Sequence, residues 1–273
     1  MGSALAGVVF QPQPSTYDGK AWRTMDGQEL EHVWVPSDRD PENPMPGYFL
    51  KCPDDDAHFT VLFSHGNAED LGIIRASCFE MAVILRCNFF LYEYTGYGIR
   101  AGSPSEVAVY EDIEAAYKYV RDVLEVPWQR IVAYGRSIGT APSVHLATRA
   151  PLRGMVLQSP MSSIYRIPFH LRFTLPGDRF CNIDKVKDVC CPTLIIHGTR
   201  DEIVPCWHSQ ALYETFRKHQ VACEAYIVDG ADHNNLESQA DVAFFNRLQR
   251  YLQHLRTSPV PERLQRQADN PCI

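Results

Sequence analysis

The sequence predicts an α/β fold in which helices flank a mostly parallel central sheet. Between residues 58 and 228, short apolar runs alternate with longer segments of helical character. The apolar runs are continuous rather than alternating, which is typical of strands covered on both faces. The segments between them are long enough to be crossover helices. We expect strands at His58–Phe63, Asn88–Tyr94, Arg130–Tyr134, Gly154–Leu157, Thr193–Ile196 and Ala222–Val228.

The composition is that of an ordinary globular protein, with 273 residues, 45% hydrophobic and 22% charged. A net charge of -7 disfavours nucleic acid as a partner. No apolar run approaches the roughly 18 residues that a transmembrane helix needs, and the N-terminus does not resemble a secretory signal. Nine cysteines at scattered spacings predict reduced thiols rather than a disulfide framework or a metal site. We therefore expect a cytoplasmic protein, with peripheral membrane contact as a further location.

One domain is expected over residues 21–256. Residues 1–20 are interrupted by Pro12, Pro14 and Gly19, which predict an irregular lead-in. Apolar pieces at 33–35 and 48–50, on either side of a proline-rich turn, predict early antiparallel strands. The tail over 257–273 is polar and contains three prolines, so we expect it to be disordered.

Two helices carry the clearest signals. Ser103 offers an N-cap, Pro104 a first helical residue and Glu106 the acidic partner three residues after the cap, which predicts a helix from 104. A second helix is predicted over Thr140–Arg149, where Pro142 is tolerable only if regular hydrogen bonding starts near it. The apolar residues of the first helix share one face and are expected in the core: Tyr110, Ile113, Tyr117, Val120 and Leu124.

The motif Gly135-Arg136-Ser137-Ile138-Gly139 lies between the strand predicted to end at Tyr134 and the helix predicted from Thr140. Strand, Gly-x-Ser-x-Gly and helix in this order are typical of a nucleophile elbow, a turn so sharp that small residues must flank the serine. A glycine-flanked serine in an ordinary turn is the alternative. We interpret Ser137 as a catalytic nucleophile.

An acid and a base follow the serine in the order that such enzymes require. Asp201 follows the strand at 193–196, and His233 follows the strand at 222–228. The carboxyl ends of parallel strands meet at one edge of the sheet, so the three side chains are expected to converge there. Ser137 would attack, His233 would be the general base and Asp201 would orient it. The competing carboxylates are Glu202 and Asp232, and the competing bases are His65, His197 and His208.

The reaction also needs donors for the oxyanion. One is expected to be the backbone N–H of Ile138, directly after the nucleophile. The other is expected from the loop at 64–70, where Asn67 is the first candidate and Ala68 the second. An alternative reading of this loop is a helix N-terminus that Asn67 caps, and the two readings are compatible.

Taken together, these and further segments resemble the α/β-hydrolase domain-containing protein 17 subfamily over residues 8–255. The resemblance implies an α/β-hydrolase fold with a minimal cap, and it implies that Ser137, Asp201 and His233 are the triad. Because that subfamily consists of acyl-protein thioesterases, it also implies hydrolysis of S-palmitoyl proteins to protein and palmitate. The segments that carry the resemblance are Ser64–Ala68, Tyr94–Gly98, Ser103–Glu106, Asp112–Ala116, Tyr134–Thr140, Asn182–Lys185 and His197–Glu202.

Two features depart from that subfamily. Its members carry an N-terminal cysteine cluster that is palmitoylated, whereas this sequence has no cysteine before Cys52. Arg136 stands where the elbow more usually has glutamine, and we expect only a local effect of this change.

The substrate side is less determined by the sequence. The apolar segment at 161–181 lies where α/β-hydrolases carry caps, and its length predicts a short wall beside an open site. Met161, Ile164, Tyr165 and Phe169 are the candidate substrate contacts, and a loop packed on the core is the alternative. The substrates would be S-acylated proteins or small acyl esters. Hydrolysis of small esters or peptides, and a non-catalytic binding module, remain as other functions, and none of these implies a metal or organic cofactor.

Overall fold

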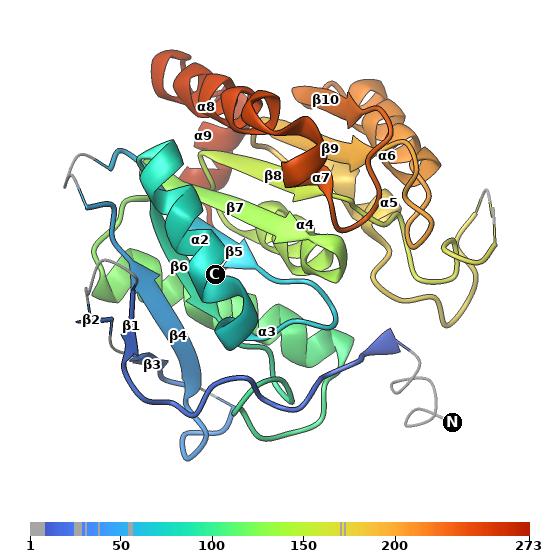
Figure 1. The fold of residues 1–273 in the computed structure, drawn as a ribbon. Helices are drawn as coiled ribbons and strands as arrows, with labels where there is room; N and C mark the ends of the chain where they lie inside the picture. The colour runs from blue at the N-terminus through green and yellow to red at the C-terminus, as the bar shows by residue number, and fades with distance from the viewer. Residues whose placement is uncertain are drawn as a thin grey trace. The chain divides into compact units, whose positions relative to one another are not determined.

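Strands and helices alternate along the chain, as the sequence predicts (Figure 1). The computed structural model describes residues 9–24, 29–30, 32–37, 39–53, 57–169, 171 and 173–273, so the first eight residues of the expected lead-in lie outside it. A mostly parallel sheet flanked by helices confirms the α/β fold class. The chain divides into two compact units, Met1–Ile131 and Val132–Ile273, whereas one domain was expected over residues 21–256.

The first unit combines antiparallel and parallel pairing. Its early strands pair antiparallel, with Val33 opposite Gly47, which confirms the antiparallel start. Within the unit the strand order is β3-β4-β6-β5, and only β5 and β6 run parallel. The strands of this unit are β1 (Trp22–Arg23), β2 (Glu29–Leu30), β3 (His32–Val35), β4 (Met45–Leu50), β5 (Thr60–Ser64) and β6 (Asn88–Tyr92).

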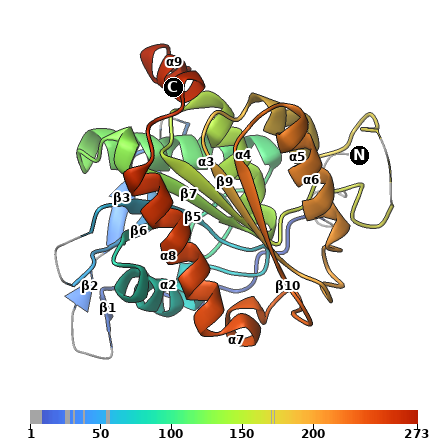
Figure 2. The same ribbon diagram turned by 90° about the horizontal axis from the view of Figure 1, so that it is seen from above.

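Two long helices cover opposite faces of the strands in this unit, α2 (Leu71–Leu85) and α3 (Glu106–Lys118) (Figure 2). Asp70 caps α2 by accepting from the N–H of Ile73, so the alternative reading in which Asn67 is the cap is wrong. Beyond α3, the chain continues through a single π-helical turn at Tyr119–Val123 and a 3₁₀ turn at Trp128–Arg130.

The start of α3 also differs from the prediction. Its N-cap is Ser105, whose hydroxyl accepts from the N–H of Ala108 at 3.1 Å, and not Ser103. Pro104 is not the first helical residue, because it packs against the turn at Gly96, where a Cβ would lie 2.6 Å from its Cδ. Ser103 and Ser105 offer the same capping chemistry, so the sequence alone does not distinguish them. The packing of Pro104 against the turn at Gly96 favours Ser105. The expected core face of the helix is confirmed at Ile113, Tyr117 and Val120, all of which are buried.

The second unit holds four strands that all run parallel, in the order β7-β8-β9-β10. Every residue of β8 and β9 is buried, as continuous apolar runs predict. The carboxyl ends of the four strands therefore point the same way. The strands are β7 (Ile131–Arg136), β8 (Gly154–Gln158), β9 (Thr193–Gly198) and β10 (Cys223–Val228).

Helices cover these strands on both faces, with α4 and α8 on opposite sides (Figures 1 and 2). Pro142 lies in the first turn of α4, where a missing N–H costs no helical hydrogen bond, so α4 tolerates it. Among the residues that the structure describes, no helix combines the length and the apolar character needed to cross a bilayer. The helices of this unit are α4 (Thr140–Arg149), α5 (Asn182–Lys185), α6 (Trp207–Lys218), α7 (Leu236–Ala240), α8 (Val242–Thr257) and α9 (Glu262–Asp269).

Within the tail over 257–273, residues 262–269 form the helix α9, so the prediction of a disordered tail is wrong. Leu264 of α9 is 0% exposed. Side chains of α9 also bond to the rest of the unit: Arg263 donates to the carbonyl of Lys187 at 2.8 Å, and Gln267 donates to the carbonyl of Ala147 at 3.1 Å. A polar composition hid this docking because it depends on one apolar residue and a few hydrogen bonds.

Candidate active site

Ser137 occupies a strained turn between β7 and α4. Its φ is 54°, a left-handed conformation that costs a non-glycine residue on the order of 1–3 kcal/mol. The 3₁₀ turn Ser137–Gly139 follows at once and leads into α4. Gly135 must be glycine, because a Cβ there would collide with the carbonyl oxygen of Gly139 and lie 2.6 Å from Oγ of Ser143. The local geometry is that of a nucleophile elbow.

The structure brings together the three side chains that the sequence singled out. Nε2 of His233 lies 3.0 Å from Oγ of Ser137, and Nδ1 of His233 lies 2.7 Å from Oδ2 of Asp201. Ser137 follows β7, Asp201 follows β9 and His233 follows β10, so all three lie at the carboxyl ends of parallel strands. All three belong to the second unit.

The carboxylate of Asp201 is buried and accepts hydrogen bonds at both oxygens. Oδ1 accepts from the backbone N–H of Ile203 at 3.0 Å and of Val204 at 2.7 Å. Oδ2 faces the imidazoles of both His233 and His197. Burial raises the pKa of Asp201, but the hydrogen bonds from His197 and His233 outweigh it and hold that pKa well below its usual value. Asp201 is therefore ionised at neutral pH.

The loop that carries His233 is fixed by tight contacts with the strand ends of the same unit. Arg200 donates its N–H to the carbonyl of Ala231 at 2.8 Å. A Cβ at Gly198 would collide with that same carbonyl oxygen, so the approach depends on glycine. Arg136, the residue before the nucleophile, donates from Nη2 to Oδ1 of Asn234 at 3.1 Å. This contact links the elbow to the residue after His233.

The competing acids and bases lie in other arrangements. Glu202 is exposed, and Asp232 accepts from the side-chain amide of Asn235 at 2.8 Å. His208 is buried against the hydroxyl of Ser162 at 2.8 Å, and His65 is buried against Glu93 in the first unit.

Sequence reasoning named His197 only as a competing base and missed its contact with the acid. Its Nε2 lies 3.0 Å from Oδ2 of Asp201. The spacing held the signal: a histidine that ends a strand, four residues before the acid, is well placed to reach it. The contact of Arg136 with Asn234 was also missed, and a separation of 98 positions gave no local signal for it.

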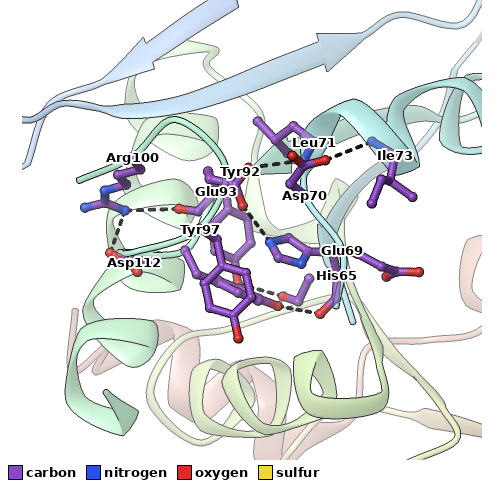
Figure 3. A network of polar contacts seen from close by, with 12 residues as sticks. His65, Glu69, Asp70, Leu71, Ile73, Tyr92, Glu93, Tyr97, Arg100 and Asp112 are labelled. Atoms are coloured by element: carbon purple, nitrogen blue, oxygen red, sulfur yellow. Dashed lines mark hydrogen bonds and ion pairs between the residues drawn. The ribbon is translucent and has the colours of Figure 1, made fainter. Parts of the chain in front are cut away.

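The loop at 64–70 belongs to the first unit and is held by a buried polar network (Figure 3). Nε2 of His65 lies 2.9 Å from Oε1 of Glu93, and Oε2 of Glu93 accepts from the N–H of Leu71 at 3.1 Å. The side chain of Asn67 accepts from the hydroxyl of Tyr97 at 2.7 Å and donates to the carbonyl of Val9 at 2.9 Å. The Asn67 side chain thus connects the lead-in, at Val9, to the loop at 64–70. That Asn67 or Ala68 supplies an oxyanion donor stays a prediction.

The segment at 161–181 contains turns and no long helix, and residues 170 and 172 lie outside the described part. Met161 is buried, Ile164 and Tyr165 are half-buried, and Phe169 is 61% exposed. Their contact with substrate stays a prediction. A groove of about 540 Å³ is lined in part by this segment, through Ser162 and Leu171, and in part by Ile183 and Trp207, but the four candidate residues do not line it.

No set of three or more histidine, cysteine, aspartate or glutamate side chains is arranged to hold a metal ion in the described ranges. The chemistry available at Ser137 is that of a hydroxyl, an imidazole and a carboxylate in series. Such a series can move a proton away from the hydroxyl and back to a leaving group.

Curated proteins that are similar in sequence to this chain are named as α/β hydrolases. The α/β hydrolase domain-containing protein aho-3 of Caenorhabditis elegans is 43% identical over 197 residues, which cover 72% of this chain and 58% of that protein. The human α/β hydrolase domain-containing protein 17C is 40% identical over 207 residues, which cover 76% of this chain and 61% of that protein. The chain thus spans about three fifths of the length of these relatives.

Solved structures and a family model show the same fold. An esterase of Pyrococcus furiosus superposes with a TM-score of 0.74 at 16% identity, covering 90% of this chain and 97% of the esterase. Dipeptidyl peptidase 4 of Porphyromonas gingivalis gives a TM-score of 0.60 at 15% identity, covering 82% of this chain and 35% of the peptidase. The prolyl oligopeptidase family model matches residues 178–257. The chain has the fold of the α/β hydrolases, and its resemblance to the α/β hydrolase domain-containing protein 17 group is confirmed.

Proposed function

We propose that this α/β-hydrolase is a serine hydrolase that works through an acyl-enzyme on Ser137. The observation that carries the proposal is the unbroken series of contacts from Ser137 Oγ to His233 Nε2, and from His233 Nδ1 to Asp201 Oδ2. The strained backbone at Ser137 supports it, because strain of this kind is concentrated at functional sites.

In the first half of the reaction, Ser137 Oγ attacks the acyl carbonyl carbon while His233 Nε2 takes the hydroxyl proton. Asp201 stabilises the imidazolium that forms. The negative charge on the carbonyl oxygen is expected to face the backbone N–H of Ile138, and such donors are each worth about 100- to 1000-fold in rate. The tetrahedral intermediate collapses, the bond to the leaving group breaks, and His233 returns the proton to the leaving sulfur or oxygen.

In the second half, water attacks the acyl group on Ser137 and gives a proton to His233. The ester bond to Ser137 then breaks, His233 returns the proton to Oγ, and the carboxylic acid leaves. The enzyme is regenerated, and one water molecule is consumed for each acyl group released.

For the substrate, we propose S-acylated cysteines of proteins, with palmitate as the acyl group. The similarity to the α/β hydrolase domain-containing protein 17 group supports this choice, because the resemblance noted in the sequence implies acyl-protein thioesterase activity. The exposed Phe169 of the segment at 161–181 fits contact with an acyl chain outside an enclosed cavity. Small acyl esters would be accepted by the same chemistry, and the proposed location is cytoplasmic, with peripheral contact at membranes.

The test is hydrolysis of a palmitoylated cysteine peptide by the wild type and by Ser137→Ala. We expect Ser137→Ala to keep its fold and to lose nearly all turnover, together with labelling by a fluorophosphonate probe. Ser77→Ala is the matched control, because Ser77 lies on α2 and donates to the carbonyl of Ile74 at 3.0 Å. Full turnover by folded Ser137→Ala would reject Ser137 as the nucleophile.

A second candidate is a carboxylesterase or serine peptidase. The prolyl oligopeptidase family model, which matches residues 178–257, favours it. A palmitoyl thioester, a p-nitrophenyl ester and an aminoacyl amide present three different leaving groups to the same nucleophile. Ranking kcat/KM over these substrates separates the candidates, and preference for the amide would replace the thioesterase proposal. A folded wild type that neither labels nor turns over any of them would instead favour a non-catalytic binding module.

A further inference from the structure

His197 brings a second imidazole to the carboxylate of Asp201. It lies in β9, just before the strand ends at Gly198, and its side chain is 0% exposed. Nε2 lies 3.0 Å from Oδ2 of Asp201 and 2.8 Å from the carbonyl oxygen of Val204. Nδ1 lies 2.6 Å from Oγ of Ser209 on α6. The ring is thus held from both of its nitrogens.

These partners determine where the proton of His197 lies. The carboxylate of Asp201 and the carbonyl of Val204 can only accept, so Nε2 must carry the proton and donate. The hydroxyl of Ser209 can donate to Nδ1, so a neutral imidazole with its proton on Nε2 has all its hydrogen-bonding groups satisfied. His233 has the opposite tautomer, because its Nδ1 donates to Asp201 and its Nε2 accepts from Ser137.

We propose that His197 is a positioning residue that fixes Oδ2 of Asp201 in line with His233, a role that rests on the proposed serine hydrolase function. Two N–H donors, one from each imidazole, converge on that single oxygen, while backbone N–H groups hold the other. Rotation of the carboxylate would break bonds at both oxygens. The orientation of the acid is therefore settled before substrate arrives, as preorganised catalysis requires.

The neutrality of the His197 ring also affects the balance of charge between Asp201 and His233. Asp201 carries one negative charge, and His233 acquires one positive charge when it takes the proton of Ser137. An N–H donor from a neutral ring orients the carboxylate without neutralising it. Ser209 serves this purpose because its hydroxyl can satisfy Nδ1 by donating to it.

The first test measures the tautomers in the wild-type protein by NMR of ¹⁵N-labelled histidine. The Nε2–H tautomer is expected for His197 and the Nδ1–H tautomer for His233. A His197 ring with its only proton on Nδ1 would overturn the proposal, since such a ring cannot donate to Asp201. This measurement needs neither a variant nor turnover.

The second test compares His197→Gln with His197→Leu, using kcat and KM for a p-nitrophenyl ester. Glutamine can present an N–H near the position of Nε2, whereas leucine cannot. We expect His197→Leu to lose about 10- to 100-fold in kcat with little change in KM, as loss of a hydrogen bond to a charged group predicts. His197→Gln should recover most of that loss. Wild-type kcat in folded His197→Leu, or equal losses in both variants, would overturn the proposal.

A matched control is His208→Gln. His208 is buried in the same unit and follows Trp207 at the start of α6, but its Nδ1 lies 2.8 Å from Oγ of Ser162 rather than beside Asp201. Its kcat should stay near the wild-type value even if its stability falls. The proposed function is judged separately by Ser137→Ala, so its failure and the failure of the His197 proposal give different results. If His197→Leu does not fold, the NMR result decides.

Discussion

Nδ1 of His233 lies 2.7 Å from Oδ2 of Asp201, although 32 positions separate the two residues in the sequence. The carboxylate can only accept, so this contact places the imidazole proton on Nδ1. Nε2 is then free to accept from Ser137, whose Oγ lies 3.0 Å away. The contact between Asp201 and His233 thus leaves Nε2 able to take the proton of Ser137 when its hydroxyl attacks.

Replacing Asp201 by asparagine should therefore remove turnover without removing the fold. The new amide can donate to Nδ1 and so favours the wrong tautomer of His233, a change that costs about 10,000-fold in kcat in enzymes with this arrangement. The measurement is kcat for ester hydrolysis, with circular dichroism to check folding. Glu202→Gln is the control, because Glu202 is an exposed neighbouring carboxylate. Loss of less than tenfold in folded Asp201→Asn would exclude Asp201 as the acid.

The same carboxylate should make stability depend on pH. The pKa of Asp201 is lowered in the folded protein, whereas an unfolded aspartate titrates near about 3.9. As pH falls, the unfolded chain takes up this proton first, so the stabilisation is complete above about pH 5 and declines below about pH 4. Urea unfolding at pH 7 and at pH 3 should give a smaller difference between wild type and Asp201→Asn at pH 3. An equal difference at both values would contradict the assignment.

The strands and the three convergent side chains could be predicted because their signals are local. A buried parallel strand reads as a continuous apolar run, and the residue after it lies at a known edge of the sheet. Ser137, Asp201 and His233 each follow such a run, so each could be predicted locally, and the structure places the three side chains together. Gly135 added an independent signal, because the turn has no room for a side chain there.

The remaining features depend on contacts between distant segments. Ser103 and Ser105 have the same capping chemistry, and only the packing of Pro104 against Gly96 decides between them. The contact of Arg136 with Asn234 spans 98 positions and has no periodic pattern. His197 differs from these two features, because its spacing of four residues from Asp201 was a local signal, although a buried strand residue is equally consistent with that position.

Loss of the charge on Glu93 should destabilise the first unit strongly. Its buried carboxylate lies 2.9 Å from Nε2 of His65 and accepts from the hydroxyl of Tyr17 at 2.9 Å. Glu93→Gln replaces one acceptor oxygen by a donor in a fully buried site, and a buried donor or acceptor left unsatisfied costs about 1–3 kcal/mol. The free energy of unfolding in urea measures this. Asp18→Asn is the control, because its pair with Lys20 is solvent-exposed and should contribute little. Equal stability of the two variants would show that the Glu93 network is dispensable.

The docked tail gives the last prediction. Leu264 is buried although its helix, α9, is only eight residues long and otherwise polar. An isolated helix of this length is unstable in water, so its order must come from docking on the rest of the second unit. Leu264→Ala should lower the free energy of unfolding by about 2–5 kcal/mol and speed proteolysis after Thr257. Gln265→Ala, an exposed position on the same helix, should do neither. If the wild-type tail is cleaved as rapidly as the tail of Leu264→Ala, the tail is not docked, and the composition-based prediction of a disordered tail is supported instead.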